Sequence, residues 1–166
     1  MKLIANIGLA VILFCSSPAS AQVKPGSASL KISGEVTKDF AFTKDDLRKL
    51  DRTTAILKDR DGRDVPYTGV SVQRLLEMAG VTTGKQLRGE NLTKYLLVKC
   101  ADGYEILFSL AELDNGFNDK KVILANESAG KDLPVDRGPF RIVIEGEKVP
   151  ARSSFQVVEF KIAFAK

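Results

Sequence analysis

The sequence contains no histidine, and its only cysteines are Cys15 and Cys100. Ser-His-Asp and Cys-His relays therefore cannot be built from this chain, because both need an imidazole to move the proton. The same shortage leaves no cluster of histidine and cysteine that could hold zinc, haem or an iron–sulfur centre. These absences argue against unaided enzymatic chemistry and favour a binding role.

Residues 1–21 have the pattern of a secretory signal peptide. Lys2 supplies the positive start, Leu3 to Phe14 is a mostly apolar run, and Ala19-Ser20-Ala21 matches a signal-peptidase site. The run is shorter than the about 20 residues that span a bilayer, so we expect no membrane span after signal cleavage. The mature chain is expected to begin at Gln22 and to be periplasmic or secreted. A lipid anchor at Cys15 is the alternative.

The charge pattern of the chain limits its partners. Lys and Arg number 25 against 21 Asp and Glu, which gives a formal net charge of +4 spread along the sequence. Without a basic run interleaved with aromatic residues, nucleic acid is not an expected partner. The expected layout is a signal peptide at 1–21, a flexible leader at 22–29 and one domain at 30–166. In that domain Cys100 has no cysteine to pair with.

Alternating and turn-forming patterns predict a set of strands with a few short helices. Thr43, three residues before Asp46, predicts a capped helix, and Ser71 is expected to cap a second helix that stops at Gly80. The expected strands lie at 30–36, 53–57, 65–70, 95–100, 104–108, 121–125, 140–144 and 158–164. The last of these alternates, with Val158 expected on its apolar face. This mixture predicts an α+β domain with a mixed β-sheet, not a parallel doubly wound fold.

Seven stretches of the sequence together resemble one known family. In chain order they read LKISGEV, FTKDDLRKL, VPYTGVSVQRLLEMAGV, KCADGYEILFSLAEL, VILAN, DLPVDRGPFRIVIEGEK and ARSSFQVVEFKI. The chain from Leu30 to Ile162 resembles the molybdopterin-binding domain of the sulfite oxidase family, in its small, exported, single-domain form. The resemblance implies the sulfite oxidase fold and, in active members, oxidoreductase chemistry on a molybdenum cofactor.

The chain departs from that family at the metal and at part of the cofactor grip. In active members a cysteine thiolate on an early strand binds molybdenum, a role that suits a soft sulfur ligand. By order along the chain it would fall near Thr54 to Lys58, where no cysteine stands. Active members also hold the pterin phosphate with histidine and a basic cluster, whereas Arg152 is followed here by Ser153-Ser154-Phe155. We therefore expect no cofactor, with molybdopterin as the alternative.

Cys100 and the Asp-Gly turn that follows it are candidate site residues. Strand parity puts Cys100 with Leu96 and Val98 on an apolar face, so we interpret it as a core residue and only weakly as a metal ligand. Asp102 and Tyr104 either simply form a turn or, as the resemblance implies, line the mouth of the ancestral pocket.

Arg137, Arg141 and Arg152 are the candidates for anion binding. A guanidinium group offers a planar fork of donors to carboxylate, sulfate or phosphate. Arg152 matches the Ala-Arg position of the family and is the best of the three candidates, and Arg141 matches its Gly-Pro-x-Arg position. The alternative for Arg141 is an outward strand residue paired with Glu145 or Glu147.

The sequence thus predicts an exported sulfite-oxidase-like domain that binds a partner instead of catalysing a reaction. The expected partner is a small anionic or polar ligand, or another exported or membrane protein, held near Arg152, Arg141 and Asp102. Two alternatives stay open: a molybdopterin-dependent oxidoreductase, and an accessory module for a membrane sensor or redox partner.

Overall fold

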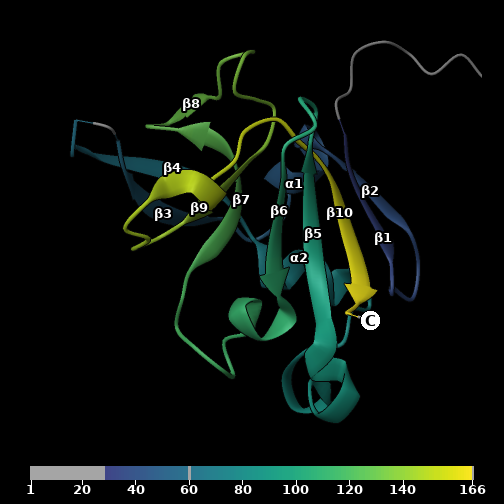
Figure 1. Ribbon diagram of the computed structural model, residues 1–166. Coiled ribbons are helices and arrows are strands. Elements are labelled where there is room, and N and C mark those ends of the chain that lie inside the picture. The colour runs from purple at the N-terminus through teal and green to yellow at the C-terminus, as the bar shows by residue number, and fades with distance from the viewer. Residues whose placement is uncertain (1–28, 60, 166) are drawn as a thin grey trace, which may run out of the picture.

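The computed structural model describes residues 29–59 and 61–165. The predicted signal peptide, and the predicted leader as far as residue 28, lie outside the described residues. In the described part, ten strands form two five-stranded sheets, which Figure 1 shows beside each other. Sheet A has the order β2-β1-β10-β5-β6, and sheet B has the order β3-β4-β7-β8, with β9 also paired to β7.

The bounds of the elements are as follows. Sheet A contains β1 (Ser29–Gly34), β2 (Phe40–Thr43), β5 (Lys94–Cys100), β6 (Glu105–Ser109) and β10 (Val157–Phe164). Sheet B contains β3 (Thr53–Lys58), β4 (Asp64–Ser71), β7 (Val122–Ser128), β8 (Lys131–Asp132) and β9 (Arg141–Ile144). The helices are α1 (Lys44–Arg48) and α2 (Val72–Met78), with short 3-10 helices η1 (Gly84–Gln86), η2 (Gly89–Thr93), η3 (Leu110–Leu113) and η4 (Pro150–Arg152).

Sheet A buries one face and exposes the other. Alternate residues of β5 are buried, and they include Cys100, as its parity predicted. The prediction for β10 is wrong at its start, because a register irregularity lies between Val157 and Glu159. A bulge adds one residue and reverses the face. Val157 is therefore buried, whereas Val158 is 39% exposed.

The main hydrophobic core lies between the two sheets and against α2. It combines the buried face of sheet A with residues of β4, β7 and β9 and with Val72, Leu75 and Leu76 of α2. The predicted capping box at Thr43 and Asp46 is confirmed. The predicted cap at Ser71 is wrong in its detail, because Ser71 precedes α2 but its side chain makes no capping hydrogen bond.

In sheet B, which curls, most of β7 and all of β9 are buried on both faces. A second, smaller core of six buried residues lies on its other face, at Ala55, Leu57, Tyr67, Ile123, Ala125 and Val143. The curl brings the edge strand β3 back beside β9. Two side chains at the ends of β9 and β7 reach β3. The Ile56 backbone N–H donates to Oε1 of Glu145, which follows β9, at 2.8 Å, and Nζ of Lys121, which precedes β7, donates to the Thr54 carbonyl at 3.1 Å. Sheet B therefore forms a half-closed barrel around the small core.

None of the helices within residues 29–59 and 61–165 is both long and apolar enough to cross a membrane.

Candidate functional site

A cavity of about 650 Å³ opens at the end of the curled sheet B, beside the turn that joins β3 to β4. Its apolar wall is formed by side chains of Leu57, Val65, Val149, Pro150 and Ala151. Its polar wall comes from the β3–β4 turn, from Arg137 and Arg141, and from Ser153, with the rings of Tyr67 and Phe155 between. This volume lies within the range of small-molecule sites.

Arg141 is the most deeply buried charged group of the cavity. Only 6% of the residue is exposed. Its Nε donates to the Ser153 carbonyl at 3.2 Å, and its Nη1 donates to the Tyr67 hydroxyl. The guanidinium carbon lies 4.7 Å from the centroid of the Tyr67 ring and 4.0 Å from that of Phe155. Burial lowers the pKa of Arg141. The Tyr67 side chain acts to raise this pKa, whereas the positive charge of Arg137 lowers it further. The group stays protonated, as arginines in proteins do.

In the part of the chain that the structure describes, no carboxylate forms an ion pair with Arg141. The alternative interpretation of Arg141, as an outward residue paired with Glu145 or Glu147, is wrong. Glu145 pairs with Lys121 at 3.4 Å, and Glu147 pairs with Arg152. The positive charge of Arg141 is therefore buried among hydroxyl, carbonyl and aromatic groups alone.

The other charges near the cavity are mostly neutralised locally. Arg63 pairs with Asp59 at 2.9 Å and with Asp61 at 3.0 Å. Lys58 pairs with Asp64 at 2.8 Å. These pairs leave the positive charge of the cavity concentrated at its arginine wall.

Arg137 adds a second positive charge to that wall. It lies 5.2 Å from the centroid of the Phe155 ring, and its nearest carboxylate, that of Asp136, is 3.8 Å away and exposed. Phe155 therefore contacts two guanidinium groups, those of Arg137 and Arg141.

Arg152 lies behind the cavity wall and is not among its lining residues. It pairs with Glu147 and, at 3.0 Å, with Glu112, and it covers the Phe108 ring at 4.7 Å. Partial burial acts to lower the pKa of Arg152, but hydrogen bonds to Glu147 and Glu112 outweigh it and raise the pKa. These contacts fix η4, whose neighbours Val149 and Ser153 face the cavity.

Asp102 and Tyr104 also lie outside the lining of the cavity. Asp102 accepts a hydrogen bond from the Tyr104 backbone N–H at 2.9 Å, which confirms the predicted turn. The Tyr104 hydroxyl donates to the carbonyl of Ala151 at 3.1 Å. The turn therefore supports the segment that forms the cavity wall.

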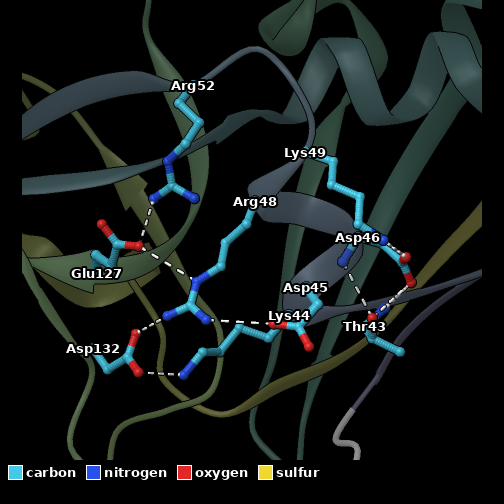
Figure 2. A network of polar contacts seen from close by, with 9 residues as sticks. All are labelled: Thr43, Lys44, Asp45, Asp46, Arg48, Lys49, Arg52, Glu127 and Asp132. Atoms are coloured by element: carbon cyan, nitrogen blue, oxygen red, sulfur yellow. Dashed lines mark hydrogen bonds and ion pairs between the residues drawn. The ribbon is translucent and has the colours of Figure 1, made fainter.

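Outside the cavity lining, an ionic network joins α1 and Arg52 to the β7–β8 hairpin. Figure 2 shows Asp132 between Lys44 and Arg48, with a distance of 2.6 Å to each. Glu127 lies 3.2 Å from Arg52 and 3.7 Å from Arg48. Because the chain runs from Asp132 directly into the segment that carries the arginines of the cavity, the network fixes where that segment begins.

Comparison with known proteins identifies the fold around this cavity. A sequence model described as "Oxidoreductase molybdopterin binding domain" matches residues 17–153. The chain belongs to this family. The predicted family resemblance is therefore confirmed.

The molybdopterin-binding domain of this chain also resembles a solved structure. The sulfane dehydrogenase SoxCD from Paracoccus pantotrophus superposes with a TM-score of 0.59 and 25% sequence identity, over 81% of this chain. This likeness and the mixed sheets confirm the predicted α+β fold. The match covers 37% of the SoxCD chain, so this chain corresponds to little more than a third of it. No curated protein matches the chain.

The residues of the cavity fit only part of a molybdenum cofactor. Arg137 and Arg141 suit the anionic part, because guanidinium groups bind phosphate. The strand end where the resemblance implies a thiolate contributes Leu57, Lys58 and Asp59 to the wall. Cys100 is 5% exposed on the core side of β5, and burial raises the pKa of its thiol. Within residues 29–59 and 61–165, no group of cysteine, aspartate and glutamate side chains is placed to hold a metal.

Tyr67 and Phe155 are site residues that the sequence analysis did not single out. Tyr67 belongs to the stretch VPYTGVSVQRLLEMAGV of the family resemblance. It lies on the same face of β4 as Val65, because the two residues are two apart in a strand. Phe155 lies in the loop after η4, where no periodicity indicates which way a side chain faces.

Proposed function

We propose that this domain binds a small anion in the cavity, with Arg141 as the principal binding group, and that it does so without a metal centre. The observation that carries the proposal is the burial of Arg141 without a carboxylate partner. A buried charge is costly unless it is paired, and an anion in the cavity would supply the missing partner. Family membership is compatible with this reading, because the family itself binds an anionic cofactor.

The geometry assigns roles to the groups around the anion. A guanidinium has five N–H donors, and Arg141 directs one each to Ser153 and Tyr67. Its remaining donors are available to an anion, and they suit two oxygens held side by side. Arg137 would add long-range attraction from the rim. The roles of Arg152 and Tyr104 would be to position the wall and not to touch the ligand.

Thermal unfolding in the presence of sulfate, phosphate and acetate tests the proposal. The wild-type protein should be stabilised by about 2.7 kcal/mol when an anion is present at 100 times its Kd. Arg141→Met should keep the fold, because apolar replacement of a buried charge is often neutral or stabilising, and it should lose the anion effect. Arg74→Met is the matched control, since Arg74 is an exposed residue of α2 outside the cavity. An Arg141→Met protein that responds to anions as the wild type does would show that the site is misassigned.

We also infer that the domain works after export. The support is the signal-peptide pattern of residues 1–21. Expression of residues 1–166 in a bacterium should yield a periplasmic protein whose amino terminus is Gln22. A cytoplasmic protein that retains Met1 would contradict export.

A molybdopterin-dependent oxidoreductase is the second candidate function, and family membership favours it. The measurement is the molybdenum and pterin content of the protein purified gently from a bacterium that makes the cofactor. Near-stoichiometric metal with pterin would support the enzyme and contradict our proposal. A folded protein that contains neither molybdenum nor pterin would support our proposal. If neither anion nor cofactor binds, the remaining candidate is an accessory module for a membrane sensor or redox partner.

A further inference from the structure

The apolar wall of the cavity bears on the kind of anion that would bind. The lining includes the aliphatic side chains of Leu57, Val65, Val149 and Pro150 as well as the two arginines. Val149 is 67% exposed although it lines the cavity. An inorganic anion would occupy only the arginine side and would leave this surface in water, whereas a ligand with an apolar body would cover it.

The aromatic rings of the cavity are already in contact with its guanidinium groups. Tyr67 and Phe155 both contact the guanidinium of Arg141, and Phe155 also contacts that of Arg137. The contacts that remain for an apolar body are therefore aliphatic. A flexible hydrocarbon chain fits them better than a flat ring system.

The charge of the cavity limits the charge of the ligand. Arg63 and Lys58 are paired with nearby carboxylates, and Arg137 is at the exposed rim beside Asp136. Among the lining residues that the structure describes, this leaves Arg141 as the one deeply buried charge, and one negative charge balances it. A carboxylate is planar and presents two oxygens at the spacing of a guanidinium fork.

We propose that the ligand of this cavity is an aliphatic monocarboxylate, with its carboxylate at Arg141 and its hydrocarbon chain along Val65, Val149 and Pro150. This inference rests on the proposed anion-binding function. It adds to it the requirement that affinity grows with the length of the chain. Each buried methylene should tighten binding about three- to fourfold until the wall is covered.

Titration calorimetry with butanoate, hexanoate and octanoate tests this requirement, with inorganic phosphate as the apolar-free anion and 1-octanol as the uncharged chain. We expect the wild-type Kd to fall from butanoate to octanoate and 1-octanol to bind at least tenfold more weakly than octanoate. Val149→Ser should weaken the dependence on chain length. Val135→Ser is the matched control, because Val135 is 96% exposed and does not line the cavity.

The outcomes separate this inference from the function on which it rests. If phosphate binds as tightly as octanoate, or if the three carboxylates bind equally, the aliphatic ligand is refuted and anion binding stands. If 1-octanol binds as well as octanoate, the carboxylate is not recognised and the inference fails. If neither phosphate nor any carboxylate binds, both the inference and the proposed function are refuted.

Discussion

Removal of the Glu145 side chain should break the hydrogen bond that links β3 to the end of β9. Ile56 lies opposite Pro66 of β4, which has no N–H, so the amide of Ile56 points away from β4 and donates to Glu145 Oε1 at 2.8 Å. A hydrogen bond to a charged acceptor contributes about 1.5–3 kcal/mol. The Glu145 side chain is 36% exposed, so solvent screening reduces this to about 1 kcal/mol. Glu145→Ala should therefore lower Tm by about 3–5 °C.

Amide hydrogen exchange locates that effect at one residue. In Glu145→Ala the Ile56 amide should exchange at least about tenfold faster, because its acceptor is gone. The Leu57 amide, which points toward Val65 of β4, is the internal reference and should change little. Glu145→Gln keeps an oxygen at the same place and should preserve most of the protection. An unchanged exchange rate of the Ile56 amide in Glu145→Ala would refute the idea that this hydrogen bond holds β3 to the end of β9.

Three further predictions concern packing and charge. Gly69→Ala would place a Cβ 2.0 Å from the Leu124 carbonyl oxygen, so we expect a loss of about 3 kcal/mol or more in a urea titration; a loss below 1 kcal/mol would contradict this contact. Burial raises the pKa of the Cys100 thiol, so its contribution to stability is present below the unfolded thiol pKa of about 8.5 and is lost as pH rises through the raised value. Stability measured between pH 8 and 11 should fall less in Cys100→Ala than in the wild type, and equal slopes would contradict this. The hydrogen bond from Lys44 lowers the pKa of Asp132, so the contribution of Asp132 to stability is present above its ordinary pKa of about 3.9 and is lost as pH falls. Asp132→Asn should therefore flatten the acid limb of the pH–stability curve. The difference between Asp132→Asn and the wild type should be smaller in 1 M salt.

The sequence was sufficient for the features of the fold that depend on local pattern. The pattern of residues 121–125 predicted a strand, and the structure places Val122 to Ala125 at the centre of sheet B, where all four are buried. The capping residue Thr43 was predicted correctly, because a capping box is defined by residues three apart. The bulge that turns Val158 outward was missed, since no sequence pattern distinguishes a bulge from a regular strand at that point.

The candidate site was predictable only as a set of residue types. Arg141 was singled out by its motif, but its burial and its missing counter-ion depend on the curl of sheet B. Arg152 was the preferred candidate, yet it pairs with Glu112, which lies 40 residues away in sequence, and it does not line the cavity. Partners at that separation are set by the tertiary fold, so the ranking of Arg152 above Arg141 could not be tested from the sequence.

The parallel pairing of β1 with β10 has a consequence for how the chain folds. The Ser33 hydroxyl and the Glu159 carboxylate, which lie on these strands, are 126 residues apart in sequence and 2.8 Å apart in space. β10 is also the strand that joins β1 to β5, so sheet A remains two unconnected pieces until the last strand is present. Closing so long a loop is slow and entropically costly, which places this step late in folding. A nascent chain that lacks β10 would therefore expose the apolar face of β1 and β5, and a ribosome stalled near Val157 should hold a protease-sensitive domain that becomes resistant only when synthesis is complete.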